Sequence, residues 1–342
     1  MNFYDDLKRI CELDGVPGRE DQVRDFIISK LPKGTEYEID ALGNLFVHKK
    51  GKKTGEKKVM VAAHMDEVGL IITHITDQGY LKFASLGGID PSVLAGRMVK
   101  LESGIKGVIG AKPIHLISKD ERKKTLDENT FTIDIGATSK EQAMEQVSLG
   151  DYATLTSTWR EFGNNSIKMK ALDDRMGCMM MLQLINEELE YDTEFVFTVQ
   201  EEVGTRGASV VNYRVRPDIA LILETTTAGD IPGAEGEQKT CLLGQGPVVS
   251  YMDRGTIYDN KLYVNTRKLA KEKQIPCQTK TKIAGGNDSS AIQKSADGAR
   301  VLAISVPTRY LHSPSSVVDR RDVDETLNLT RELLKVLGTG EL

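Results

Sequence analysis

The sequence has few cysteines, few aromatic residues and no excess of positive charge. Its 342 residues include 4 cysteines and 1 tryptophan, and the formal net charge is −5. Because the cysteines form no Cys-x-x-Cys pair, they indicate neither a disulfide framework nor a structural zinc knuckle, and free thiols favour a cytoplasmic location. A general nucleic-acid surface would normally require a basic excess, so we expect no nucleic-acid partner.

Long hydrophobic runs are also absent. No stretch of about 18 apolar residues occurs, and residues 1–13 form an acidic amphipathic segment, so we predict neither a membrane span nor a signal peptide. The 39% of apolar residues is nevertheless enough for a packed core. Since single hydrophobic cores usually stop growing at roughly 250–300 residues, the chain length favours one large domain and a smaller one.

Helical periodicity and short apolar runs alternate over most of the chain. Helical spacing occurs in 3–13, 19–31, 175–189, 259–271, 289–294 and 323–337, and apolar runs typical of buried strands occupy 59–63, 195–199, 219–223 and 301–306. This alternation predicts an α/β fold, a three-layer sandwich around a largely parallel sheet. Between Gly69 and about Phe162, short β-prone segments separated by glycines interrupt this alternation. We therefore predict a discontinuous main domain, 1–67 and 163–342, and an inserted small all-β domain, 68–162.

Histidine and carboxylates follow the predicted buried strands. The string VMVAAHMDEVG places His64 and Asp66 directly after one strand, and FVFTVQEEVG places Glu201 and Glu202 after another. In open α/β sheets, ligands bind beyond the carboxyl ends of the strands. Two adjacent carboxylates at a buried strand end are costly unless cations compensate their charge. These positions suit metal binding and acid/base chemistry, although a structural, hydrogen-bonded histidine explains the first string alone equally well.

Three further strings add candidate ligands. ALDDRMG puts Asp173 and Asp174 at a predicted helix start, where aspartate is also a common N-cap. IALILE ends a buried strand on Glu224, and VPTRYLHSP places His312 just after another strand. The spacing of these residues is too wide for a local metal knuckle but suits a site assembled across one edge of a sheet.

These strings together resemble the ordered motifs of the M42 metallo-aminopeptidases, a family whose members also carry names such as glutamyl aminopeptidase, FrvX and endoglucanase. The matching strings are AAHMDEVG, ALDDRMGC, TVQEEVGTRGA, LETTTAGD, AGGNDSSAI and PTRYLHSPSSVVD. They occur in the family's order over nearly the full chain, which makes the resemblance specific. It implies a di-metal aminopeptidase that removes N-terminal residues from peptides with a free N-terminus.

The resemblance also implies a ligand set for two divalent ions. His64 and Glu224 would bind one ion, His312 and Glu202 the other, and Asp173 would bridge both. Zinc is the favoured metal, with cobalt and manganese as alternatives. Glu224 departs from the family pattern, in which many members have Asp, so the metal preference at this position stays open.

Two further residues complete the implied site. Asp66 would orient His64, and Glu201 would take a proton from the attacking water and return one to the departing amine. Other hydrolase classes remain alternatives: an N-acyl-amino-acid deacylase or carboxypeptidase on a related fold, and a glycoside hydrolase, which needs two carboxylates but no metal. The single tryptophan disfavours the glycosidase, because sugar-binding grooves are usually lined with aromatic residues.

Several residues stay outside the predicted site. In GGNDSSAI, at a predicted helix start, Asn287 or Asp288 acting as an N-cap is as good an explanation as direct substrate contact, so Asp288 is left out of the site. His48, His74 and His115 have no partnered carboxylate in the sequence pattern and are expected to be non-ligands.

The inserted β domain resembles the family's dimerisation module, which implies a PDZ-like fold. In the family, such dimers commonly assemble into tetrahedral dodecamers, so we expect a homo-oligomer. The sequence does not indicate which N-terminal side chain the site prefers.

Overall fold

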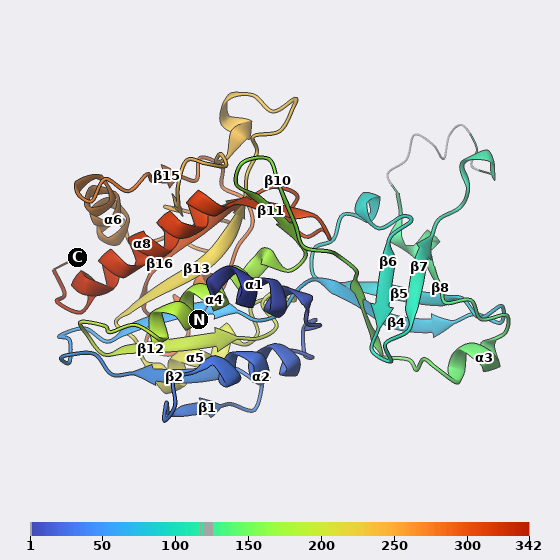
Figure 1. The fold of residues 1–342 in the computed structure, drawn as a ribbon, viewed down its shortest axis with the longest axis horizontal. Coiled ribbons are helices and arrows are strands. Elements are labelled where there is room, and N and C mark those ends of the chain that lie inside the picture. The colour runs from blue at the N-terminus through green and yellow to red at the C-terminus, as the bar shows by residue number, and fades with distance from the viewer. Residues whose placement is uncertain (1, 117, 119–125, 342) are drawn as a thin grey trace.

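The computed structural model describes residues 2–116, 118 and 126–341, and it confirms the α/β class (Figure 1). Its largest element is an eight-stranded sheet of order β1-β2-β12-β3-β13-β16-β14-β15. The strands are β1 (Tyr37–Ile39), β2 (Leu45–Lys49), β3 (Val59–His64), β12 (Thr193–Thr198), β13 (Ile219–Thr227), β14 (Val248–Val249), β15 (Gln278–Thr279) and β16 (Arg300–Thr308). Strands β12, β3, β13 and β16 run parallel, whereas β2 and β14 run antiparallel to their central neighbours. The sheet is therefore parallel at its centre and mixed towards its edges.

Helices cover both faces of the central strands, which explains why these strands are almost entirely apolar. Successive residues of a strand point to opposite faces, so Val61 joins one apolar cluster and Met60 another. The Val61 face packs against α1 (Phe3–Glu12), α2 (Asp21–Lys30), α4 (Leu172–Ile185), α6 (Asn260–Glu272) and α8 (Arg320–Leu337). The Met60 face packs against α5 (Ala208–Val215) and α7 (Ser289–Ile292).

A closed β-barrel is inserted between β3 and α4 and forms a second lobe beside the sheet (Figure 1). Its strands are β4 (Gly69–Ile75), β5 (Leu81–Leu86), β6 (Met98–Leu101), β7 (Lys106–Gly110), β8 (Thr132–Asp134) and β9 (Tyr152–Leu155), and the short helix α3 (Lys140–Met144) accompanies them. The barrel has its own apolar core, which includes Leu70, Leu81 and Phe131. The next strand, β10 (Arg160–Phe162), pairs outside the barrel with β11 (Ser166–Met169), which in turn pairs with β17 (Ser316–Asp319).

A buried carboxylate joins the barrel to the main body. Asp14, in the turn between α1 and α2, is only 5% exposed. It accepts hydrogen bonds from Lys100 Nζ at 2.7 Å and from Thr154 Oγ1 at 2.9 Å, and both partners belong to barrel strands. Because these charged and polar groups satisfy one another within a largely buried contact, they fix where the barrel stands relative to the sheet edge.

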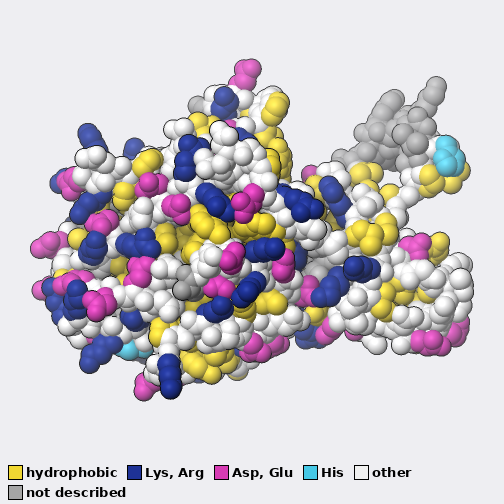
Figure 2. Space-filling model, viewed as in Figure 1, with side chains coloured by type: hydrophobic (Ala, Val, Ile, Leu, Met, Phe, Trp, Pro, Cys, Tyr) yellow, Lys and Arg dark blue, Asp and Glu magenta, His cyan; other side chains and the backbone are white. Residues whose placement is uncertain are grey.

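The face of the molecule in Figure 2 carries interleaved positive and negative side chains, in keeping with the nearly balanced composition. Among the described residues, no helix combines the length and the hydropathy that a membrane crossing requires.

Arg175 of α4 is fully buried and ties three segments of the main body together. Its Nε donates to the Met65 carbonyl and its Nη1 to the Ile10 carbonyl, each at 2.7 Å. Its Nη2 lies 3.6 Å from Glu67 Oε1, and Glu67 is also ion-paired with Lys170. The guanidinium thereby holds the chain immediately after His64.

Replacement of Arg175 by Met should lower the free energy of unfolding by about 3–5 kcal/mol, because buried partners lose their cation and donors. Urea denaturation followed by circular dichroism measures this change. Arg9→Met is the matched control, since Arg9 is a 66% exposed side chain and such surface changes usually alter stability by less than ~0.5 kcal/mol. An equally small effect at both positions would contradict the structural role of Arg175.

Candidate metal and catalytic site

The carboxyl ends of four parallel strands meet at one edge of the sheet, and the predicted residues emerge there. His64 is the last residue of β3 and pairs in register with Thr198, the last residue of β12. Glu201 and Glu202 follow β12, Glu224 lies on β13, and His312 follows β16. Parallel pairing aligns these strand ends, as expected for a site at the carboxyl edge of an α/β sheet.

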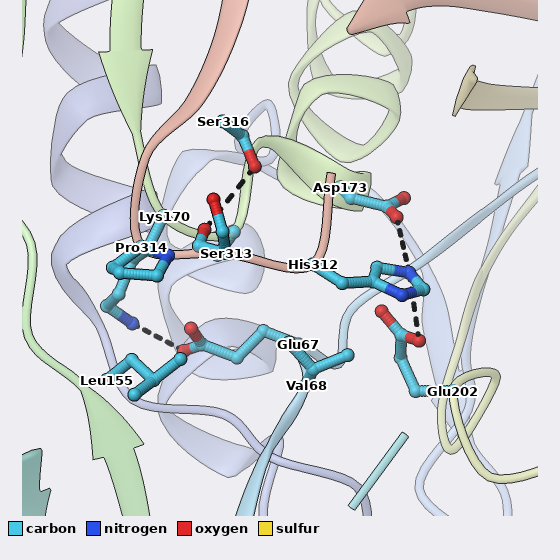
Figure 3. Close-up of a pocket in the computed structure, with 11 residues that line it drawn as sticks. Glu67, Val68, Leu155, Lys170, Asp173, Glu202, His312, Ser313, Pro314 and Ser316 are labelled. Carbon is cyan, nitrogen blue, oxygen red and sulfur yellow. Dashed lines mark hydrogen bonds and ion pairs between the residues drawn. The ribbon is translucent and has the colours of Figure 1, made fainter. Parts of the chain in front are cut away.

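Asp173 lies between two histidines. Its Oδ1 is 3.3 Å from His64 Nε2, and its Oδ2 is 3.3 Å from His312 Nε2. His64 Nε2 is also 3.6 Å from Glu224 Oε1, and His312 Nε2 is 3.4 Å from Glu202 Oε2. Figure 3 shows His312 standing between Asp173 and Glu202. The five predicted ligands therefore lie together, with one carboxylate oxygen of Asp173 facing each histidine.

Asp66 connects the end of β3 to the end of β12. Its Oδ1 accepts the backbone N–H of Glu201 and its Oδ2 that of Glu202, both at 3.0 Å. The Nδ1 atom of His64 is 3.1 Å from the Asp66 carbonyl and 3.4 Å from Asp66 Oδ1. The sequence predicted only contact with His64, whereas the structure shows that one carboxylate positions the neighbouring glutamates as well.

The barrel lobe also contacts the site. His312 Nδ1 lies 2.8 Å from the carbonyl oxygen of Gly88, which orients the imidazole so that Nε2 faces Asp173 and Glu202. The preceding residue, Gly87, has φ of 93°, and a Cβ atom there would lie 2.7 Å from Val68 Cγ1. Sequence patterns gave no sign of this contact, because neither glycine carries a side chain that suggests a role.

The cluster brings several buried carboxylates together with only two histidines to balance their negative charge. Burial raises the pKa of Glu202 and of Glu224 to about 8, and neighbouring Asp173 adds to both effects. Burial alone would lower the pKa of His312, but Asp173 and Glu202 raise it to about 9. Such carboxylates are stabilised by divalent cations, and the mixed histidine and carboxylate donors suit zinc, cobalt or manganese. The residues present therefore fit a metal centre.

Two groups of three residues could each hold a metal ion, because the ligand atoms within a group lie within 4.8 Å of one another. They are His64, Asp173 and Glu202, and His64, Asp174 and Glu224. The second group contains Asp174, which the sequence offered beside Asp173 but which the family resemblance did not assign as a ligand. Asp174 is fully buried, and among the described residues its Oδ2 has no hydrogen-bond partner. The adjacent carboxylates of ALDDRMG were the available signal, but the common N-cap role of aspartate concealed it.

Of the two candidate caps in GGNDSSAI, Asp288 makes no side-chain cap, whereas Asn287 Oδ1 accepts the N–H of Ser289 at 2.9 Å. Asp288 is 2% exposed and its Oδ2 accepts the hydroxyl hydrogen of Thr198 at 2.5 Å. Burial raises the pKa of Asp288 to about 6. It therefore lies behind the strand end that carries the site.

His48 has a carboxylate partner, contrary to the sequence-based expectation. Its Nδ1 lies 3.1 Å from Glu194 Oε1, because β2 and β12 place the two residues opposite each other. Glu194 is near the start of β12, whereas His64 is level with its end. The His48–Glu194 pair therefore lies at the opposite end of the strands from the candidate site.

The comparisons with known proteins agree with this geometry. A family model described as M42 glutamyl aminopeptidase matches residues 43–329. The chain is 34% identical to the lysyl aminopeptidase of Pyrococcus furiosus, over 97% of this chain and 96% of that protein. Among solved structures, it is 35% identical to an aminopeptidase of Desulfurococcus kamchatkensis, with a TM-score of 0.90 and coverage of 98% and 94%. The TET1 peptidase of Pyrococcus horikoshii, described as able to assemble into a tetrahedron or a large octahedral shell, is 34% identical, with a TM-score of 0.85 and coverage of 98% and 100%.

The fold and these relatives define the protein as an aminopeptidase, a hydrolase that acts on peptides. The chain belongs to the M42 family, as its motifs predicted.

Proposed function

We propose that this aminopeptidase uses two divalent ions. The position of Asp173 carries the proposal, since its two oxygens lie 3.3 Å from the Nε2 atoms of different histidines. His64 and Glu224 would hold one ion and His312 and Glu202 the other, with Asp173 shared between them. Asp174 is a further candidate ligand on the His64 side.

Bound ions would lower the pKa of a shared water and polarise the scissile carbonyl. The protein's own contribution to proton transfer would be Glu201, which lines the same cavity as His64 and Asp173. Burial raises the pKa of Glu201 well above the usual range of a glutamate. A carboxylate of raised pKa holds a proton well enough to pass it from the attacking water to the departing amine. Asp66 would position this group through the backbone N–H of Glu201.

Removal of the metal should abolish peptidase activity. The purified protein would be treated with a chelator, dialysed, and assayed with an aminoacyl p-nitroanilide. We expect activity to fall to background and to return with zinc, cobalt or manganese, because the carboxylate cluster alone cannot activate water at neutral pH. Calcium or magnesium at equal concentration serves as the control for a non-specific ionic effect. Full activity after verified metal loss would overturn the metal assignment.

An aminopeptidase requires a substrate with a free N-terminus, and this requirement distinguishes it from the other enzyme classes considered for this fold. An N-acetylated aminoacyl anilide should not be hydrolysed by an aminopeptidase, whereas a deacylase would accept a blocked N-terminus and a carboxypeptidase would hydrolyse neither anilide, because both lack a free C-terminal carboxylate. A glycoside hydrolase would be insensitive to chelation, so the same pair of assays covers all the alternatives.

We further propose that the helices on both sheet faces form a three-layer sandwich and that residues 68–162 are a PDZ-like dimerisation domain. The tetrahedral assembly described for the TET1 peptidase supports dimers that build a dodecamer. Static light scattering of the purified protein tests this assembly. Free cysteines throughout the chain support a cytoplasmic location.

A further inference from the structure

The cavity that contains the candidate catalytic residues also contains two lysines. It has a volume of about 430 Å³, and its lining includes Glu201, Glu224, Thr225, Lys280 and Lys282. A cavity of this size accommodates one amino-acid side chain together with the bond to be cleaved. Both lysines come from a single segment just after β15, on the sheet edge beyond β14.

Lys280 is a half-buried cation without an anionic partner. Its Nζ donates to the Ala284 carbonyl at 2.8 Å, and among the described residues no carboxylate forms an ion pair with it. Lys170 and Lys100, by contrast, pair with Glu67 and Asp14, whereas the half-buried Lys82 and Lys168 also use only carbonyl or hydroxyl oxygens but lie outside this cavity. Burial lowers the pKa of Lys280, although Asp253 and Glu224 nearby act in the opposite direction. An ammonium held in this way is stabilised when an anion enters the cavity.

Lys282 lies two residues after Lys280, is exposed and lines the same cavity. The cavity thus offers two ammonium groups beside the candidate metal ligands.

We propose that this cavity recognises the side-chain carboxylate of an acidic N-terminal residue, glutamate or aspartate, with Lys280 as its principal partner. The inference rests on the proposed function and deepens it, because family membership leaves the preference open: one relative is a lysyl aminopeptidase, whereas the family description is glutamyl. Lys280 and Lys282 would repel a lysyl or arginyl side chain. An apolar side chain would leave the Lys280 ammonium unpaired, which disfavours it in turn.

The test compares glutamyl and glutaminyl p-nitroanilides, which differ only in charge, with the metal-loaded enzyme. Wild type should prefer the glutamyl substrate by at least about tenfold in kcat/KM, the usual effect of one charge-assisted hydrogen bond. Lys280→Met should bring this ratio close to one. Lys271→Met is the control, because Lys271 is exposed on α6 outside the cavity, and it should keep the wild-type ratio.

Charge reversal protects the test against a variant that simply folds poorly. Lys280→Glu should create a preference for lysyl over norleucyl p-nitroanilide, and a gain of this kind requires a folded protein. An unchanged glutamyl-to-glutaminyl ratio in both Lys280 variants would overturn the inference.

A substrate carboxylate has a second source, the C-terminus of a short peptide. Dialanine and its C-terminal amide distinguish this source from the side chain, since neither has a charged side chain. If Lys280→Met lowers hydrolysis of dialanine relative to the amide but leaves the glutamyl preference intact, the inference is wrong while the proposed function stands. A metal-loaded enzyme that hydrolyses no unblocked substrate overturns both.

Discussion

Replacement of Glu201 by Gln is expected to lower kcat by about two to four orders of magnitude, the usual contribution of general acid/base catalysis. Glutamine has the same shape and keeps the backbone N–H that Asp66 accepts at 3.0 Å. It cannot accept and return a proton at neutral pH, so only the chemical step should suffer. Initial rates with an aminoacyl p-nitroanilide measure the loss.

Metal content separates this effect from a damaged site. Elemental analysis of Glu201→Gln should give the same amount of bound metal as wild type, because Glu201 is not among the proposed ligands. Glu188→Gln is the matched control, since Glu188 is 88% exposed, and it should retain full activity. A Glu201→Gln enzyme with near-normal kcat would remove Glu201 from the mechanism.

Replacement of Asp173 by Ala is expected to weaken the binding of both ions and to reduce activity to background. Each of its oxygens faces a different histidine, and no other side chain in the described part of the chain has the same contacts on both sides of the site. Loss of a group that merely orients a ligand typically costs 10–100-fold in metal affinity, so loss of a shared ligand should cost at least about this much. Calorimetric titration of the metal-free protein with zinc measures the affinities.

The number of ions that the variant retains is the decisive observation. Asp297→Asn, at an 84% exposed side chain, controls for general effects of removing a carboxylate and should bind zinc as wild type does. If Asp173→Ala loses one ion and keeps the other at wild-type affinity, Asp173 is a ligand of a single ion and the bridge is wrong.

The sequence predicted the centre of the fold well because its signals are local. Strands β3, β12, β13 and β16 are buried on both faces and therefore appear as apolar runs that end in polar residues. Those ends are also where the predicted ligands emerge. Apart from Asp173, which lies in α4, the predicted site residues were thus found from the same feature as the fold, a polar residue at or shortly after the end of an apolar run.

The edges of the sheet were missed for a physical reason. Strand β1 is exposed along its whole length, and β14 and β15 have two residues each, so none of them has an apolar run to detect. Their position depends on hydrogen bonds to strands that are distant in sequence. The predicted start of the helix at 175 agrees with the backbone, which is not helical at Asp173 and Asp174 although α4 is assigned from Leu172, whereas the predicted end at 189 lies beyond Ile185.

Contacts between distant segments account for the rest of the site. The Gly88 carbonyl at His312, the Thr198 hydroxyl at Asp288 and the position of Lys280 in the cavity each depend on how separate segments come together. A glycine carbonyl or a lone lysine has no distinctive pattern in a single sequence. Such features become visible only when the tertiary structure shows which groups have partners.

The contact between Gly88 and His312 also bears on when the enzyme becomes able to cut peptides. His64 and His312 come from opposite halves of the chain, and the group that orients His312 belongs to the barrel lobe. During synthesis, a chain released only as far as the barrel has one histidine of the pair and no Asp173. On the proposed ligand set, peptide cleavage therefore has to wait until His312, which follows the last strand of the parallel core, has left the ribosome and the barrel has docked.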